Sequence, residues 1–176
     1  MPLVFKDDLF DAQWLRAARH SSSGGAEIGE CFAAASRIRE PDAESWFRAW
    51  SELAEGVLAG ADRSQDDGRQ VSALSAYLRA SNYFRTAYTF LIGAPVYRRV
   101  IETYRRQRAA FEAAVGLMWP TAERISIPYN GAMLHGYLFR ADDAATPRPT
   151  LIINGGYDST GEEGFFQRRC GCRSRV

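Results

Sequence analysis

The chain has 176 residues, of which 46% are hydrophobic and 12% aromatic, and its 22 Lys plus Arg nearly balance its 21 Asp plus Glu. This length and composition suit one folded domain, or one domain with part of another, and exclude a disordered chain. The net charge of +1 argues against a role driven by bulk charge on nucleic acid or on a membrane surface.

Amphipathic helices are predicted for the N-terminal part of the chain. Apolar side chains recur there at the spacing of a helix face, over residues 7–20, 26–39, 42–60, 70–91 and 96–117. Asp42 has the side chain of an N-cap and follows Pro41, so the third helix is expected to begin there. The polar residues 61–68 predict a loop. The helix over 70–91 is so widely apolar that it needs cover on two sides.

Strand signals replace helix signals after these helices. Residues 123–129 and 133–140 read as two strands, and Asn130-Gly131 between them is a strong β-hairpin signal. A later apolar run predicts a buried strand over 150–154. The order of helices, hairpin, buried strand, glycine turn and helix start indicates an α/β protein.

A glycine turn follows this last strand at residues 154–160. Gly155 and Gly156 allow the backbone to approach a ligand closely. Thr160 begins the pattern Thr-Gly-Glu-Glu, which fits the capping box at the start of a helix. Backbone N–H groups exposed at such a point can stabilise an oxyanion. A purely structural turn would use the same residues, so the turn by itself leaves both interpretations open.

The helix at 71–87, the Trp46–Trp50 helix, the hairpin at 127–131 and the turn at 154–159 are all similar to one group of hydrolases. This group lies within the α/β-hydrolase fold superfamily and comprises the fermentation–respiration-switch-type esterases and dihydropseudooxynicotine hydrolase. Its members carry a helical region ahead of the hydrolase core. The resemblance covers residues 20–166.

The resemblance implies an α/β fold in which a helical, cap-type region over 1–118 precedes the start of an α/β-hydrolase core over 119–166. That start would comprise the first three strands, the oxyanion turn and the beginning of the next helix. The resemblance also implies that the backbone of Gly155, Gly156 or Tyr157 donates to an oxyanion hole, whose second donor follows the nucleophile. The implied reaction is hydrolysis of an ester, amide or activated C–C bond in a small-molecule substrate, without a cofactor.

The residues that would carry out this hydrolysis are missing from the sequence. No serine lies in the G-x-S-x-G pattern of the family, because Ser159 is flanked by Tyr157 and Gly161 at the two glycine positions. The only histidines, His20 and His135, precede the turn, whereas the family places its base after the nucleophile. We therefore expect no triad and no activity of this chain by itself, which leaves its status as an enzyme open.

A non-catalytic helical interaction module is the alternative reading of the same chain. It would carry an unpaired sheet edge, and such an edge can pair with another chain. Self-association or a homo-oligomer formed through this edge is therefore the partner expected besides a small-molecule substrate.

Residues 167–176 depart from the family pattern, because they are rich in arginine and contain Cys170 and Cys172. We expect a frameshift or premature stop near Phe166, which would make the chain the N-terminal portion of a longer, truncated hydrolase. A natural short tail is the alternative. A C-x-C pair lacks the four ligands of a structural zinc site, so no metal is expected.

The sequence also bears on location. Three cysteines without a disulfide pattern, and an N-terminus without the order of a signal peptide, predict a cytoplasmic protein. No apolar run approaches the ~20 residues that span a bilayer, so no membrane partner is expected.

Overall fold

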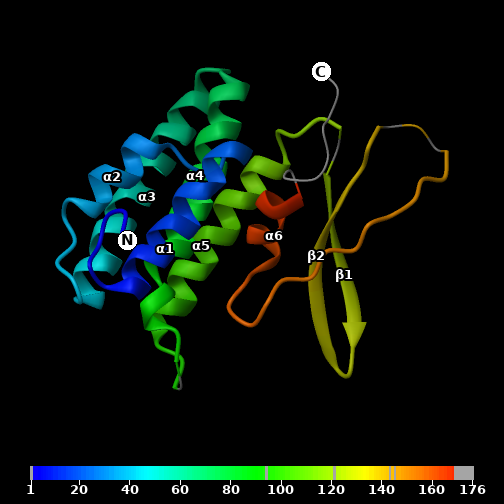
Figure 1. Cartoon of the computed structure of the whole chain (residues 1–176). Helices are drawn as coiled ribbons and strands as arrows, with labels where there is room; N and C mark the ends of the chain where they lie inside the picture. The colour runs from blue at the N-terminus through cyan, green and yellow to red at the C-terminus, as the bar shows by residue number, and fades with distance from the viewer. Residues whose placement is uncertain (1, 94, 121, 143, 145, 169–176) are drawn as a thin grey trace.

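The computed structural model describes residues 2–93, 95–120, 122–142, 144 and 146–168. Helices α1 to α5 gather on one side of the molecule, a β-hairpin lies on the other, and α6 lies between them (Figure 1). The elements in chain order are α1 (Asp8–Ala18), the 3-10 helix η1 (Arg19–Ser23), α2 (Ile28–Ala35), α3 (Ala43–Asp66), α4 (Gln70–Ala87), the 3-10 helix η2 (Thr89–Leu91), α5 (Arg98–Val115), β1 (Ala122–Tyr129), β2 (Ala132–Phe139) and α6 (Gly161–Arg168).

The start of α3 confirms the predicted cap. The carboxylate of Asp42 accepts hydrogen bonds from the N–H groups of Glu44 and Ser45 at 2.9 and 3.1 Å. The predicted loop over 61–68 is wrong, because α3 continues to Asp66. Its polar residues form the exposed face of a helix, and the helix ends only where Gly68 adopts a φ of +73°.

The predicted helix over 70–91 divides into α4 and the short η2. Near its end the hydroxyl of Thr86 donates to the carbonyl of Asn82 at 2.8 Å. Thr89 donates in the same way to Arg85 at 3.3 Å. Such bonds back to the preceding turn compete with the helical ladder and commonly bend helices, which accounts for the change to a 3-10 turn.

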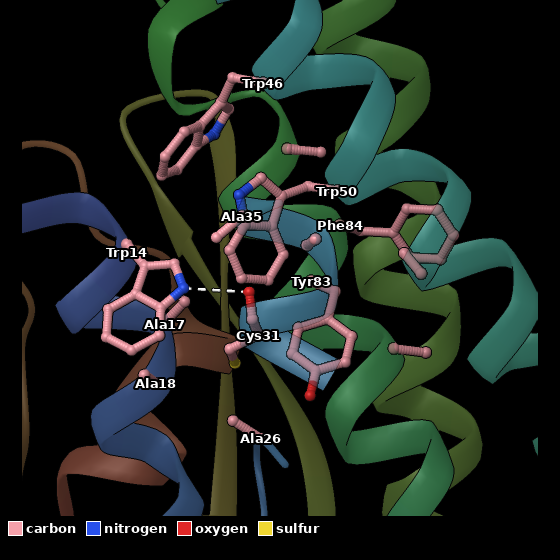
Figure 2. Close-up of a cluster of buried hydrophobic side chains, with 14 of the residues drawn as sticks. Trp14, Ala17, Ala18, Ala26, Cys31, Ala35, Trp46, Trp50, Tyr83 and Phe84 are labelled. Atoms are coloured by element: carbon pink, nitrogen blue, oxygen red, sulfur yellow. Dashed lines mark hydrogen bonds between the residues drawn. The ribbon is translucent and has the colours of Figure 1, made fainter. Parts of the chain in front are cut away.

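Tryptophan side chains form the centre of the helical core (Figure 2). Trp46 and Trp50 of α3 are fully buried and lie 5.7 Å apart between ring centroids. The indole N–H of Trp46 donates to the carbonyl of Thr86 at 2.8 Å, and that of Trp14 donates to the carbonyl of Cys31 at 3.0 Å. These two bonds tie α3 to α4 and α1 to α2, so the helices close over one another without help from the strands.

The predicted hairpin is confirmed. Strands β1 and β2 pair antiparallel from Ala122 opposite Phe139 to Tyr129 opposite Ala132. Asn130 and Gly131 between them both have positive φ, +47° and +77°, as the two central residues of a type I′ turn require. No helix in the described ranges combines the length and the apolar character needed to cross a membrane.

The third predicted strand is wrong in this structure. Residues 150–154 carry no strand assignment, and the side chains of Leu151 and Ile152 are 78% and 88% exposed. A strand exists only where a neighbour accepts and donates its backbone hydrogen bonds, and no other described segment pairs with this one. The predicted tail at 167–176 lies outside the described residues from 169 onward.

Helix α6 packs back onto the helical side of the molecule. Phe165 and Phe166 are 5% and 3% exposed, and the hydroxyl of Ser23 donates to the carbonyl of Phe166 at 3.0 Å. A Cβ placed on Gly25 would lie 2.5 Å from the ring of Phe166, so only glycine leaves room for this ring. From the strand side, the hydroxyl of Tyr137 donates to Glu162 at 3.0 Å.

Candidate functional site

The glycine turn at 154–160 is closed by one backbone hydrogen bond, from the N–H of Ser159 to the carbonyl of Gly156 at 3.1 Å. Gly155 is required as glycine because a Cβ there would collide with the side chain of Ser159. At Gly156, by contrast, no atom lies within 4 Å of where a Cβ would stand. The side chain of Tyr157 is fully exposed. The turn therefore leaves open space beside Gly156.

Helix α6 begins directly after this turn at a partial capping box. The hydroxyl of Thr160 accepts a hydrogen bond from the N–H of Glu163 at 3.3 Å, as the sequence pattern predicts. It also accepts one from Nε2 of Gln107 in α5 at 2.8 Å. The carboxylate of Glu163 accepts a hydrogen bond from Arg16 of α1 and lies 3.3 Å from Nε of Arg85 in α4, so it is engaged away from the cap that its sequence position predicts.

Two arginines of the helical region meet two carboxylates of the turn and of α6. Arg16 of α1 donates from Nε and Nη2 to the two oxygens of Glu163 at 2.6 and 2.7 Å, and it also bonds to Asp158. Arg85 of α4 donates to the backbone carbonyl of Asp158 at 3.1 Å and lies 3.3 Å from Glu163. We name these four residues the Arg–carboxylate cluster.

Burial and charge in this cluster act on its carboxyl groups in opposite directions. Burial would raise the pKa of Glu163, but the hydrogen bonds from Arg16 and the charges of both arginines outweigh it, so the pKa lies below its ordinary value. The hydrogen bond from Arg16 is the main cause that lowers the pKa of Asp158. Both carboxylates are therefore ionised near neutral pH, and the cluster carries two positive and two negative charges.

The two histidines lie apart from each other and have different surroundings. His20 is buried and stacks on Phe166 at 4.9 Å between ring centroids, and burial lowers its pKa to about 4. His135 lies on β2 with its Nδ1 3.1 Å from the hydroxyl of Ser126 on β1. The structure thus places neither histidine beside Ser159, the serine of the turn.

Arg16 and Arg85 are not among the site residues predicted from the sequence. Arg85 is 3% exposed on its side chain, although it lies on the helix that the sequence marks as the most apolar of the chain. A charged residue inside such a face requires a buried partner, and this is the signal that points to a cluster. The partner itself, Glu163, is 78 residues further along the chain and gives no local signal.

A groove of about 540 Å³ lies elsewhere, between α2, α3 and α4. At one wall Arg79 is bound to Glu30 at 3.1 Å and to Ser75 at 2.9 Å. Within the described ranges, His, Cys, Asp and Glu side chains form no group that could hold a metal ion. Cys31 is buried, and Cys170 and Cys172 lie outside the described residues.

The chain is similar to several hydrolases. Hydrolase acrC of Aspergillus aculeatus is 38% identical over 176 residues, which cover 92% of this chain and 41% of that relative. Alpha/beta hydrolase gkaG of Penicillium citrinum is 39% identical over 163 residues, which cover 90% of this chain and 38% of that relative. The chain thus spans about two fifths of the length of the curated relatives that it matches. No family model matches it.

A solved structure agrees with these relatives. The crystal structure of the 2,6-dihydroxy-pseudo-oxynicotine hydrolase matches with a TM-score of 0.69 and 25% identity, over 88% of this chain and 41% of that one. The expected fold class is therefore confirmed for the part of the fold that this chain covers: a helical region followed by the first strands of an α/β-hydrolase core.

Proposed function

Since this chain is a relative of α/β hydrolases, we propose that it supplies the helical, cap-type region and the beginning of the catalytic core of such an enzyme. The helical region would comprise residues 1–118, and the core would begin over 119–166. The observation that carries the proposal is the match of 90% or more of the chain to α/β hydrolases at 38–39% identity. A hydrolase of this kind acts on a small-molecule substrate.

Within this enzyme, the backbone N–H groups of Gly155, Gly156 and Tyr157 are the proposed donors to an oxyanion hole. The open space beside Gly156 supports this assignment, because a substrate oxygen can approach the backbone there. The turn also directly precedes the N-terminus of α6, where backbone N–H groups favour negative charge. A donor placed in this way stabilises the negative charge that develops on the carbonyl oxygen when the bond is attacked.

The proposed substrate bond is an ester, an amide or an activated C–C bond next to a carbonyl. Cleavage of any of these bonds requires a nucleophile, a base and an orienting acid besides the oxyanion donors. The sequence has no G-x-S-x-G motif, and His20 is buried while His135 pairs with Ser126 on the hairpin. We therefore propose that the chain by itself does not turn over substrate.

A chimeric enzyme tests the oxyanion assignment. The segment of hydrolase acrC that matches this chain is replaced by residues 1–166, and hydrolysis of p-nitrophenyl acetate is measured. We expect the chimera to be active, and we expect Tyr157→Pro or Gly156→Pro, each of which removes one N–H, to lower kcat by about 100-fold or more. Ser126→Ala on the hairpin serves as the control. Unchanged kcat in both proline variants would refute the assignment.

The isolated chain gives the second measurement. We expect no turnover of p-nitrophenyl acetate above the buffer rate. Turnover that persists in Ser159→Ala and in His135→Ala would reveal a site outside the residues discussed above, and would contradict the proposal that the chain is inactive by itself.

The non-catalytic interaction module remains the second candidate, and one observation favours it. The helical core closes by itself, whereas apolar side chains of the hairpin such as Ile127 and Leu134 remain 51% exposed. A folded but inactive chimera, together with an isolated chain that binds a partner through its hairpin, would select the module over the hydrolase.

A further inference from the structure

We propose that Arg16 and Arg85 are positioning residues. Through their hydrogen bonds to Asp158 they hold the glycine turn in the conformation that its oxyanion role requires. The inference rests on the proposed function for its purpose, but its structural content can be measured without any catalysis. It assigns to the helical region a direct influence on the backbone that would contact the substrate.

The turn has little support from its own residues. Its only internal backbone bond is the one from Ser159 to Gly156 at 3.1 Å. The segment before it carries no strand pairing, and its side chains at 151 and 152 are largely exposed. A backbone with few buried contacts opens at low free energy, so the orientation of its N–H groups requires outside contacts.

Arg85 supplies such a contact at the peptide that follows the proposed donors. Its Nη2 donates to the backbone carbonyl of Asp158 at 3.1 Å. The same peptide unit carries the N–H of Ser159, which donates to Gly156. This peptide is therefore fixed at its carbonyl and at its N–H. The carbonyl of Gly156 that accepts the bond belongs to the peptide unit that carries the N–H of Tyr157, so the direction of that N–H is restricted as well.

Arg16 holds the side chain of the same residue. It bonds to the carboxylate of Asp158, and Nη2 of Arg85 lies 3.3 Å from that carboxylate as well. Glu163, whose side chain is 2% exposed, accepts hydrogen bonds from Arg16 and lies at ion-pair distance, 3.3 Å, from Nε of Arg85. Charged hydrogen bonds of this kind are stronger than neutral ones, and the planar guanidinium fixes geometry as well as charge.

Helix α6 has contacts that do not involve Asp158. It is anchored by Phe165, Phe166 and the bond from Gln107 to Thr160, and Glu163 links it to the same two arginines. These contacts would remain if the carboxylate of Asp158 were removed. Asp158 lies on the turn itself, and its side chain is 43% exposed. Its contacts are therefore expected to restrict the conformation of the turn rather than to attach the helix.

The experiment compares Asp158→Asn with Asp142→Asn in the purified chain. The two carboxylates are equally exposed, at 43%, and each pairs with arginine, but Asp142 bonds to Arg148 outside the turn. We measure ¹⁵N order parameters and amide hydrogen exchange. In Asp158→Asn we expect the order parameters of Gly156 and Tyr157 to fall from a rigid value of about 0.85 toward 0.6.

We also expect the exchange of the Ser159 amide to accelerate about tenfold in Asp158→Asn, while the amides of α3 and α6 keep their rates. Asp142→Asn should leave the turn unchanged, and Asp158→Glu, which retains the carboxylate, should restore most of the order. An unchanged turn in Asp158→Asn would overturn the proposal. Equal acceleration in the turn and in α6 would also overturn it, because it would show a merely structural role.

This result is independent of the chimeric assay. A turn that loosens in Asp158→Asn while Tyr157→Pro leaves kcat of the chimera unchanged would support the positioning by Arg16 and Arg85 and refute the oxyanion role. A rigid turn in Asp158→Asn with a strong effect of Tyr157→Pro would do the reverse.

Discussion

The helical region buries its large apolar side chains, whereas the hairpin leaves several of its own exposed to solvent. Trp46 and Trp50 of α3 are fully buried, whereas Ile127 and Leu134, cross-strand partners on the hairpin, are each 51% exposed. Helices α3, α4 and α5 cover one another's apolar faces, whereas the hairpin packs against helices at Tyr137 and Phe139 and leaves Ile127 and Leu134 half exposed. The stability of this chain therefore resides in its helices.

The C-terminal segment also contains both buried and exposed apolar side chains. Phe165 and Phe166 are buried against the helices, while Leu151 and Ile152, fifteen residues or fewer before them, are 78% and 88% exposed. The glycine turn lies between these two extremes. Its position next to a well-packed helix explains how a turn with so few contacts of its own can be held by the Arg–carboxylate cluster.

The largest expected effect comes from the helical core. Trp50→Ala should lower the free energy of unfolding by about 3–5 kcal/mol, because it removes a fully buried aromatic ring. Ile127→Ala on the hairpin, half exposed, should cost less than about 1 kcal/mol. Urea unfolding followed by circular dichroism gives both values. Equal losses would break the contrast between the two regions.

The next largest effect is expected in the pH dependence of stability, and it comes from His20. The pKa of His20 in the folded chain is about 4, below its ordinary 6.5, so between these values the unfolded chain takes up a proton that the folded chain does not. The free energy of unfolding should therefore fall by about 2 kcal/mol from pH 7 to pH 5. His20→Asn should remove most of this fall, and His135→Asn on the hairpin should retain it. An identical pH dependence in both variants would contradict the assignment.

A smaller effect is expected on the hairpin surface. Leu134→Lys should change the free energy of unfolding by no more than about 0.5 kcal/mol, because the side chain is already half exposed. If the hairpin mediates self-association, the added charge should shift the chain toward the monomer in sedimentation velocity. Ser126→Lys on the neighbouring strand is a matched change of charge at a polar position. A distribution of oligomers that is unchanged by Leu134→Lys would remove the hairpin as the contact.

The smallest effect should come from an exposed ion pair on the helical side. Arg98 is 91% exposed on its side chain and pairs with Glu102 one turn later at 2.6 Å. Arg98→Ala should cost about 0.3–0.5 kcal/mol at low salt and less at high salt. A loss comparable to that of Trp50→Ala would show that burial does not govern stability in this region.

The features that the sequence predicts correctly are those with local causes. The cap at Asp42, the turn at Asn130-Gly131 and the hydroxyl of Thr160 at the start of α6 each depend on residues two or three positions away. The incorrect loop over 61–68 has a local cause as well. Polarity by itself does not separate a loop from the exposed face of a long helix, and this run contains no breaker before Gly68.

The features that the sequence does not predict depend on distant partners. The strand expected over 150–154 has the right residues but no neighbour in the described chain. The contact of Arg16 with Glu163 joins residues 147 positions apart, and no local sequence pattern around either residue predicts the other as its partner. The candidate oxyanion residues could be predicted because the turn resembles that of a known hydrolase group, whereas the arginines that contact the turn could be identified only from the fold.

Gly25 gives this arrangement a steric dependence. Because Gly25 has no side chain, the ring of Phe166 can lie against its backbone. The ring is only 2.5 Å from the position that a Cβ at residue 25 would take. A single added methyl group at residue 25 would push Phe166 outward and tilt α6, which carries Glu163 of the Arg–carboxylate cluster. The geometry of the glycine turn thus depends on the absence of a side chain at Gly25, in the loop between η1 and α2 and about 130 residues earlier in the chain.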